Sequence, residues 1–464
     1  MSSLDAFFRP KSVAIVGAAE RETSSGGAVL RNARISGFRG KVIPVNQKGG
    51  SILGLEVKTS LREVDPPADL AIIVVRPDLI LDAVRDAAES GHKRLLILPG
   101  GFAEAGDAGI ARDAELRRLA SKHGITVAGP NCAGIIDQLD RESPFAATFL
   151  RDMPRGGGVA FVSQSGAIAE QVIAKSHELG LPIGAVVSVG NAVHLGVTEY
   201  LEHYGSDDRC QVIALYVESF GDTERFKTVA HRVAATKPIV ALVGGRSVPG
   251  VGAAKRHTGG DAPANDALDI LLGECGVIRV DSLRRLLIAC KGLGAFPQGL
   301  GRRILLLSNS GGPGVLTTDS AAREGLSLPD LPKALAEELR HRLPGEAAVA
   351  NPLDLLADAR EERFGDTLTL ALAQCKDVFD AILVLHVVPF MVDASPVVAR
   401  LADIAKNTDV PVMHSMMGTL PGKKDWFAAL EAARVPVFDD AEEMAVAAGL
   451  AARYGAIRRS LMPR

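Results

Sequence analysis

The sequence predicts an α/β protein built on mainly parallel sheets. Short apolar runs bounded by Gly or Pro recur along the chain, and a longer amphipathic stretch follows each of them, as in successive βα units. Hydrophobic residues make up 47% of the sequence but aromatic residues only 4%, which suits buried parallel strands rich in Val, Ile and Ala. The 48 glycines fit the many tight turns that join strands to helices in this fold class.

Three domains are expected, because 464 residues exceed what one hydrophobic core normally organises. Two Gly/Pro-rich segments, near residues 151–158 and 294–303, predict domains at 1–150, 151–297 and 298–464. Strands of the first domain are expected at 12–16, 41–45, 70–75, 94–98 and 126–128, and helices at 27–36, 79–90 and 108–122. Later strands are expected at 158–163, 183–189, 211–217, 238–242, 304–308, 381–387, 410–414 and 435–437. Residues after Tyr454 are expected to form a basic tail.

Composition narrows the classes of partner. A net charge of −3 gives no long-range attraction for nucleic acid or an anionic membrane, so a small molecule is expected. The five cysteines are scattered without a CxxC pair, which predicts reduced thiols in a cytoplasmic protein and no metal site. The N-terminal residues do not resemble a secretion signal, and no run of 18 apolar residues occurs.

The first strand-to-helix turn has the composition of an anion-binding site. It runs from Gly17 to Gly27 and is rich in small residues, so backbone amides and a helix N-terminus can approach a phosphate closely. It lacks the GxGxxG pattern, and Lys48 follows the second strand where an NAD site would place an acidic residue. A lysine there suits an additional phosphate. The residues alone leave a purely structural turn equally open.

The second domain offers a phosphate site and a histidine. The turn Ser163, Gln164, Ser165 and Gly166 follows a strand and opens a helix, so it can bind phosphate or simply cap the helix. His257 lies in a loop of small residues, and a neutral imidazole can accept a phosphoryl group. Glu218, at the end of a predicted strand, can orient such a ring or be a solvated loop residue.

Five segments in order suggest a family: SVAIVGAA, PVNQKGGSILGLEVKTSLREV, DLAIIVVRP, GFAEAG and GPNCAG. They resemble the CoA-binding domain of succinyl-CoA synthetase α subunits and of ADP-forming (NDP-forming) acyl-CoA synthetases. The resemblance implies a Rossmann-like CoA-binding domain followed by two flavodoxin-like domains. The CoA contacts that it implies, from the phosphates to the thiol, are Gly17, Ser24, Ser25, Lys48, Val75, Pro77 and Asn131.

The segment around His257 resembles the SHTG loop whose histidine carries the phosphoryl group in these enzymes, with Glu218 as the orienting acid. Arg256 replaces the usual serine and Asp261 lies in a run that departs from the family pattern, so an altered phosphate environment is expected. The implied chemistry uses no cysteine, and Cys132 is expected to be a buried thiol. In the third domain, Asn309 and Asp354 are expected to serve structure and docking.

The resemblance implies an α subunit that interconverts a small carboxylic acid, CoA and ATP with acyl-CoA, ADP and phosphate. The sequence contains no GxxxxGK[ST] loop and no further module of about 200 residues. ATP/ADP with Mg is therefore expected on an ATP-grasp β subunit, in an α/β hetero-oligomer. Two alternatives are a non-catalytic CoA-binding sensor or scaffold of the same fold, and an NAD(H)-binding redox protein, which Lys48 and the missing GxGxxG disfavour.

Overall fold

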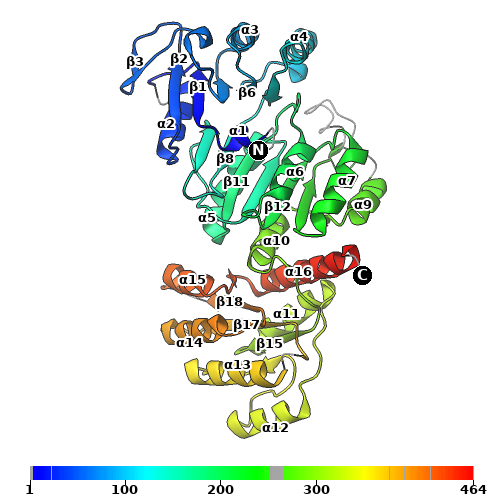
Figure 1. Cartoon of the computed structure of the whole chain (residues 1–464). Helices are drawn as coiled ribbons and strands as arrows, with labels where there is room; N and C mark the ends of the chain where they lie inside the picture. The colour runs from blue at the N-terminus through cyan, green and yellow to red at the C-terminus, as the bar shows by residue number, and fades with distance from the viewer. Residues whose placement is uncertain are drawn as a thin grey trace. The chain divides into compact units, whose positions relative to one another are not determined.

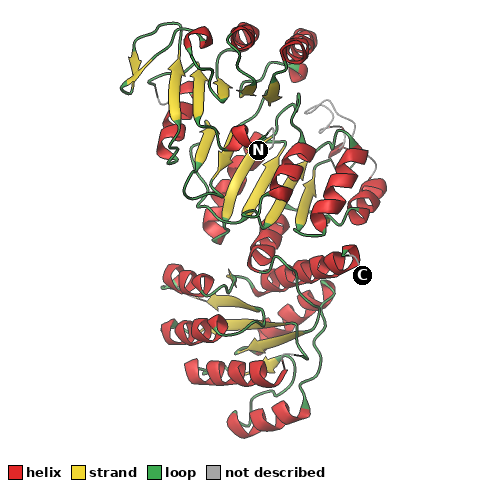
Figure 2. Ribbon diagram, viewed as in Figure 1, coloured by secondary structure: helices red, strands yellow, loops and turns green. Residues whose placement is uncertain are grey.

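The computed structural model describes residues 4–21, 23–245, 247, 249–250, 252, 265–375, 377–390, 392–418 and 420–462. The chain folds into two compact units, Met1–Ser282 and Leu283–Arg464. Each unit is built from sheets flanked by helices, two large sheets in the first unit and one in the second (Figures 1 and 2). The predicted α/β fold class is confirmed. Among the described residues, none of the helices combines the length and apolar character that a membrane span requires.

The first sheet is parallel, with the order β2-β1-β5-β6-β7. Its strands are β1 (Ser12–Val16), β2 (Lys41–Val45), β5 (Leu70–Ile73), β6 (Arg94–Ile97) and β7 (Thr126–Ala128). The α-helices of this part are α1 (Asp5–Phe8), α2 (Ser25–Ile35), α3 (Ile80–Glu89) and α4 (Asp107–His123). Short elements are the hairpin β3 (Ser51–Ile52) and β4 (Leu55–Glu56), and the turns η1 (Leu61–Glu63), η2 (Pro77–Leu79) and η3 (Ala103–Ala105).

The second sheet has the order β14-β13-β12-β10-β11-β8-β9, and β8 and β9 are antiparallel. Its strands are β8 (Gly134–Asp137), β9 (Phe145–Thr148), β10 (Val159–Ser163), β11 (Ile183–Ser188), β12 (Val212–Val217), β13 (Ile239–Val243) and β14 (Ile278–Val280). The helices α5 (Gly166–Leu179), α6 (Val197–Ser206), α7 (Thr223–Ala234) and α9 (Asn265–Glu274) connect them.

The second unit contains one parallel sheet, ordered β16-β15-β17-β18-β19. The strands are β15 (Ile304–Ser308), β16 (Leu353–Asp354), β17 (Ala381–Val388), β18 (Val412–Gly418) and β19 (Val437–Phe438). The helices are α10 (Leu283–Ala295), α11 (Gly311–Arg323), α12 (Lys333–Arg342), α13 (Glu361–Cys375), α14 (Ser395–Lys406), α15 (Lys423–Ala432) and α16 (Ala441–Leu461). Apolar side chains of α13, α14 and α15 pack with those of β15, β17 and β18 in one core.

The parallel strands of all three sheets share one arrangement. Numbered in chain order within each sheet, they lie in the order 2-1-3-4-5, with β8 and β9 added to the second sheet beside β11. In this arrangement the connections run to opposite sides after strands 1 and 3, which leaves a crevice at the carboxyl ends of these two strands. The chain therefore has three such crevices, at β1/β5, β10/β12 and β15/β17.

The structure confirms the predicted strands within a few residues but differs from the prediction in three places. β8 and β9 lie before the predicted boundary at residue 150, yet β8 pairs with β11 of the second sheet. The compact units divide at Ser282/Leu283, so α10 belongs to the second unit rather than to the second domain. The expected tail after Tyr454 is wrong, because α16 continues to Leu461 and Tyr454 is fully buried.

Candidate active site

A cavity of about 730 Å³ opens at the crevice between β1 and β5. This volume lies within the range of small-molecule sites. At one end the cavity is bordered by the N-terminus of α2, and at the other by the loop after β7 and the first turns of α5. The residues that line it include Gly17, Ser24, Ser25, Gly26, Val75, Arg76, Pro77, Gly100, Asn131, Cys132, Ala133, Phe149, Gly166, Ala167 and Glu170.

The turn between β1 and α2 brings backbone very close to backbone. A Cβ atom on Gly26 would lie 2.0 Å from the carbonyl oxygen of Gly17, and a Cβ on Gly17 would lie 2.6 Å from that of Val74. Ser24 caps α2, since its hydroxyl accepts from Gly27 N at 3.2 Å. The first amides of α2 therefore face the cavity without a side chain between them, as an anion requires.

Six of the seven predicted CoA contacts line this cavity, and one does not. Gly17, Ser24, Ser25, Val75, Pro77 and Asn131 are all part of its wall. Lys48 lies in the exposed turn after β2 and is not part of the wall. The cation that does line it is Arg76, which the sequence interpretation missed. Arg76 is 76% exposed and lies 3.3 Å from Asp78. Its position three residues after the buried strand β5 was the available signal.

At the β10/β12 crevice, the side chains of the predicted phosphate turn form hydrogen bonds that stabilise the turn itself. The hydroxyl of Ser163 donates to Ser165 O at 2.7 Å and accepts from Ser165 N at 3.1 Å. Gln164 bridges to the end of β12: its Nε2 donates to Ser219 O at 2.8 Å, and its Oε1 accepts from the amides of Glu218 and Ser219. What this turn can offer an anion is the pair of amides at Gly166 and Ala167, which begin α5 and have no intrahelical partner.

Glu218 lies beside this turn and is 7% exposed. Tyr216 donates a hydrogen bond to its Oε1 at 3.1 Å. Burial, together with the Glu218 carboxylate, raises the pKa of Tyr216 to about 12, so the phenol remains a donor at neutral pH. The end of β12 pairs with the end of β13 through Val217 and Val243, and the chain runs from β13 toward the histidine loop. His257 lies outside the described residues, as do Arg256 and Asp261.

The β15/β17 crevice repeats the same turn in the second unit. The hydroxyl of Ser308 donates to Ser310 O at 2.9 Å and accepts from Ser310 N at 3.0 Å. Asn309 bridges to Val387 of β17 through both its amide nitrogen, at 2.9 Å, and its amide oxygen, at 2.8 Å. Asn309 is 1% exposed, which fits the structural role expected for it. The Asp354 carboxylate accepts from Leu356 N at 2.9 Å.

Cys132 lines the cavity but its thiol is held inside. The residue is 5% exposed, and its Sγ donates to Ile97 O at 3.4 Å. Burial raises the pKa of the Cys132 thiol to about 12. A thiol with this pKa is not a thiolate at neutral pH, so Cys132 is not activated as a nucleophile.

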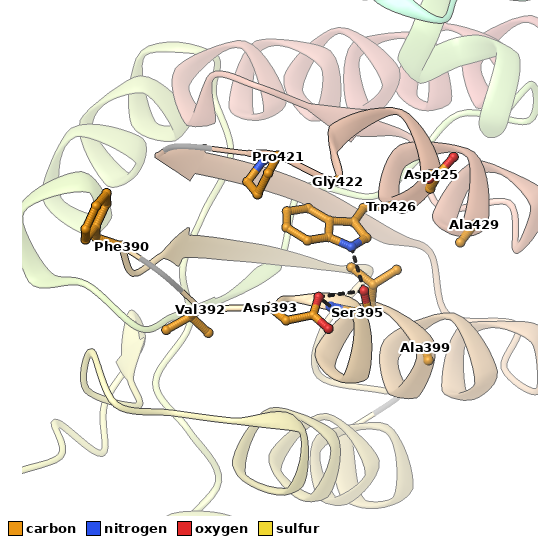
Figure 3. Close-up of a pocket in the computed structure, with 11 residues that line it drawn as sticks. Phe390, Val392, Asp393, Ser395, Ala399, Pro421, Gly422, Asp425, Trp426 and Ala429 are labelled. Atoms are coloured by element: carbon orange, nitrogen blue, oxygen red, sulfur yellow. Dashed lines mark hydrogen bonds between the residues drawn. The ribbon is translucent and has the colours of Figure 1, made fainter.

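A second cavity, of about 760 Å³, lies in the second unit between α14 and α15 (Figure 3). Trp426 and Val398 form much of its apolar wall, and Phe390 stands at its rim with 81% of its surface exposed. The Trp426 indole donates to Ser395 Oγ at 2.9 Å, and Ser395 Oγ donates to Asp393 at 2.6 Å. This cavity is at the ends of β17 and β18, and neither the turn after β15 nor any of the residues singled out in the sequence lines it.

Comparison with known proteins places these sites in a family. Residues 11–138 match the family model of a CoA binding domain, 156–293 that of a succinyl-CoA ligase like flavodoxin domain, and 304–462 that of a Ligase-CoA domain. ADP-forming acetate–CoA ligase II subunit alpha of Pyrococcus furiosus is 33% identical over 453 residues, which cover 96% of each chain. The chain belongs to the ADP-forming acyl-CoA synthetases.

Another relative is longer than this chain. ADP-forming acetate–CoA ligase I of Archaeoglobus fulgidus is 35% identical over 367 residues, which cover 79% of this chain but 53% of that protein. This chain thus spans about half the length of that relative. Among solved structures, the dinucleotide-forming acetyl-coenzyme A synthetase 1 of Ca. Korarchaeum cryptofilum, in complex with phosphate and ADP, is 30% identical with a TM-score of 0.92, covering 100% of both chains.

Proposed function

We propose that this chain is the α-type subunit of an ADP-forming acyl-CoA synthetase. In the proposed reaction, a small carboxylic acid, CoA and ATP interconvert with acyl-CoA, ADP and phosphate, and His257 carries the phosphoryl group. The observation that carries the proposal is the continuity of one cavity. The same 730 Å³ space is bordered by the amides that begin α2 and by those that begin α5, so a CoA site and a phosphoryl site open onto each other.

The residues along the cavity fit CoA. The amides at the start of α2 and the Arg76 guanidinium can hold its phosphates, because a helix N-terminus and a cation both favour anions. Val75 and Pro77 give the middle of the cavity an apolar wall for the pantetheine arm. The thiol would then lie near Asn131, next to Gly166 of α5. Lys48, which does not line the cavity, would contribute only long-range attraction to this site.

The start of α5 is suited to the phosphoryl group in transit. Phosphoryl transfer relies on positioned amides and charge more than on covalent machinery. The amides of Gly166 and Ala167 can stabilise the phosphoryl oxygens. Glu218, fixed by Tyr216 and by the Gln164 bridge, can accept a hydrogen bond from His257 and stabilise the imidazolium that phosphorylation creates.

We assign the nucleotide to a partner chain. The Pyrococcus furiosus relative that matches this chain end to end is a subunit, and the Archaeoglobus fulgidus relative has about twice the matched length in one protein. A separate chain can supply the part of that relative that this chain does not match. We propose that this partner is an ATP-grasp β subunit that binds ATP/ADP with Mg, and that the active enzyme is a cytoplasmic α/β hetero-oligomer.

Phosphorylation of His257 tests the proposal. The chain is mixed with its β subunit and Mg·ATP carrying labelled γ-phosphate, and the label on the α chain is measured before and after brief acid treatment. We expect a label that is lost in acid and kept in alkali, as a phosphoramidate should be. His257→Ala should abolish it, and Glu218→Gln should slow it by roughly 10²-fold.

A matched control uses Ser163→Ala, because a phosphoserine in the phosphate turn would also give a label. That label would survive acid treatment and disappear in Ser163→Ala, whereas the proposed label is lost in acid and is abolished by His257→Ala. Undiminished labelling of His257→Ala would overturn the proposal. If CoA binds but no label forms under any condition, the non-catalytic CoA sensor becomes the better description.

A further inference from the structure

A chain of three hydrogen-bonded side chains ends at the wall of the cavity. Asn131 Nδ2 donates to Asn191 Oδ1 at 3.2 Å, and Asn191 Nδ2 donates to Glu104 Oε2 at 2.5 Å. Glu104 is anchored in turn, since its Oε1 accepts from Gly101 N at 2.5 Å and from Phe102 N at 3.1 Å. The three residues come from three connections between elements: Glu104 from η3 after β6, Asn131 from the loop after β7 and Asn191 from the loop after β11. The sequence interpretation assigned no role to Glu104 or Asn191.

The loops that carry these residues are held together by their backbones. Asn131 N donates to Pro99 O at 3.0 Å, and Asn191 N donates to Pro130 O at 2.9 Å. Asn131 has a φ of +58°, a conformation in which asparagine is one of the more tolerated residues. These backbone hydrogen bonds hold the three side chains within reach of one another. The orientation of each terminal amide group can still change, and the hydrogen bonds among the side chains determine it.

An ionised carboxylate sets the direction of the whole chain. A carboxylate only accepts hydrogen bonds, whereas an asparagine amide has one accepting and one donating side. Glu104 therefore turns the Asn191 nitrogen toward itself, and Asn191 must offer its oxygen to Asn131. Asn131 in turn gives its nitrogen to Asn191. Burial raises the pKa of Glu104, but the hydrogen bonds from Asn191 and from the amides of Phe102 and Gly101 together lower it more, so Glu104 is charged at neutral pH.

The consequence is that Asn131 keeps its oxygen for a ligand. Asn131 Oδ1 accepts no hydrogen bond from any residue in the described part of the chain. It points toward Gly100, where a Cβ atom would lie 2.9 Å from it, and both Gly100 and Asn131 line the cavity. A side chain at position 100 would also meet Glu104 Oε1, at 2.8 Å. Gly100 thus leaves the oxygen of Asn131 open toward the cavity.

We infer that Glu104 and Asn191 are positioning residues that orient the Asn131 amide, so that its oxygen accepts a hydrogen bond from a donor at the thiol end of CoA. This inference rests on the proposed CoA site. The donor is either the CoA thiol or the amide N–H nearest to it. Glu104 touches neither, and acts only through the two amides.

Glu104→Gln tests the inference because it keeps the size of the side chain and reverses the order of donors. The glutamine introduced at this position must keep its oxygen on the amides of Gly101 and Phe102, so its nitrogen faces Asn191. Both asparagine amides then rotate, and Asn131 presents its nitrogen to the cavity. We expect the dissociation constant of CoA to rise by roughly 10-fold, the effect of one unsatisfied polar contact. Adenosine 3′,5′-bisphosphate, which lacks the pantetheine arm, should bind with unchanged affinity.

The matched double variant, Glu104→Gln with Asn191→Asp, moves the carboxylate one position along the chain at constant net charge. The carboxylate introduced at position 191 accepts from the amide introduced at position 104 and from Asn131 Nδ2, so Asn131 again presents its oxygen. CoA affinity should return to within about 3-fold of that of the unchanged protein. Loss of packing at position 104 would not be repaired by this second change. Desulfo-CoA identifies the donor: equal rescue for CoA and desulfo-CoA assigns the amide, and rescue for CoA alone assigns the thiol.

Three outcomes would overturn the inference. The first is that Glu104→Gln binds CoA as tightly as the unchanged protein. The second is that the double variant binds CoA no more tightly than Glu104→Gln. The third is that a folded Glu104→Gln protein loses as much affinity for adenosine 3′,5′-bisphosphate as for CoA. If Glu104→Gln does not fold, Asn191→Leu replaces it in the test. Asn191→Leu must then lower the affinity for CoA but not that for the bisphosphate, and an unchanged CoA affinity would contradict the inference. If the unchanged protein binds neither ligand, the proposed CoA site itself fails.

Discussion

Burial decides the chemistry of single side chains in the first unit. Cys132 lies at the inner end of the cavity, where a nucleophile would be useful, yet its thiol donates to Ile97 O and its pKa is raised to about 12. Arg76 shows the opposite case, because it is exposed at the wall of the cavity. The depth of neither side chain follows from its residue type.

Cys132→Ser should retain most of the turnover of the assembled enzyme. The proposed chemistry has no step for a protein thiolate, and the change should cost about 1 kcal/mol of the free energy of unfolding. Steady-state kinetics with CoA and the acid, next to a thermal melt, checks both statements. A loss of activity as complete as that of His257→Ala would instead indicate a covalent thioester on Cys132.

Arg76→Ala should weaken CoA binding more than Lys48→Ala does. Arg76 lines the cavity and can contact a phosphate directly, whereas Lys48 acts only through the field of its charge. Calorimetry at low ionic strength should show a loss of roughly 10-fold for Arg76→Ala and a smaller, salt-sensitive loss for Lys48→Ala. The reverse order would mean that the turn after β2 closes over CoA when it binds.

Two strand-to-helix turns of the protein are built to the same plan. Gln164 and Asn309 follow strands β10 and β15, and each amide side chain bridges to the end of the adjacent strand, β12 or β17. Each bridge fixes one side of a crevice relative to the other. Sequence similarity between the two turns is short, but the paired donors and acceptors are the same.

Gln164→Leu should lower the free energy of unfolding of the first unit by roughly 2–3 kcal/mol, because the amides of Glu218 and Ser219 lose their acceptor. It should also slow labelling of His257, since Glu218 is no longer held. Gln164→Glu is a comparison variant. It keeps the acceptor but puts a charged oxygen against Ser219 O in place of the donor, so its effect measures the donor side together with the added charge. An unchanged unfolding free energy of Gln164→Leu would show that the bridge does not stabilise the turn.

A pair of buried histidines in β17 and β18 makes the second unit sensitive to acid. His386 is 2% exposed and His414 is 0% exposed, with ring centroids 6.0 Å apart. Burial lowers the pKa of His386 to about 4, with a smaller contribution from Arg360, and burial lowers the pKa of His414 well below its usual range. The unfolded chain therefore binds protons more readily than the folded one.

The free energy of unfolding should not depend on the protonation of these rings above pH 6.5, their unfolded pKa. It should fall as the pH drops from 6.5 toward 4, because the unfolded chain then binds protons that the folded chain does not. The expected loss from His386 is about 3 kcal/mol. Trp426, the only tryptophan in the chain, is buried in the second unit, so its fluorescence in urea titrations at pH 7 and pH 4.5 reports this loss. His386→Asn should show a weaker pH dependence. An unchanged dependence would assign the acid sensitivity to other groups.

The three sheets share one strand order, but they are expected to serve different functions. The cavity proposed for CoA lies entirely within the first unit, between residues 17 and 170. The β15/β17 crevice of the second unit offers a similar turn, but the 760 Å³ cavity of that unit is lined by residues of other connections. CoA binding is therefore expected of this chain alone, whereas phosphoryl transfer from ATP is expected to need the proposed partner.

The isolated chain should bind CoA with a measurable heat and should show no saturable binding of Mg·ATP. Calorimetry with each ligand checks this, and NADH serves as the control for the redox alternative. Tight binding of ATP to the isolated chain would remove the reason for an ATP-grasp partner. Tighter binding of NADH than of CoA would reassign the first domain.

The sequence by itself determined the α/β class, most strands and the position of the strand-to-helix turns that are proposed to bind anions. These features depend on local periodicity and on small residues next to strand ends, and both are visible along the chain. It also led to Asn131 and Glu218, through the resemblance. The sequence did not reveal that β8 and β9 join the second sheet, because strand pairing between distant segments leaves no local pattern.

Only the tertiary structure decided which polar groups work together. Asn191 is 60 residues from Asn131 and 87 residues from Glu104, so their contact exists only after two sheets have formed. The structure also shows that Arg76, and not Lys48, lines the cavity. It shows that the side chain of Gln164, which was predicted to bind phosphate, bridges to the end of β12. Hydrogen bonds over such separations depend on the packing of whole elements, and packing is a property of the folded chain rather than of any one segment.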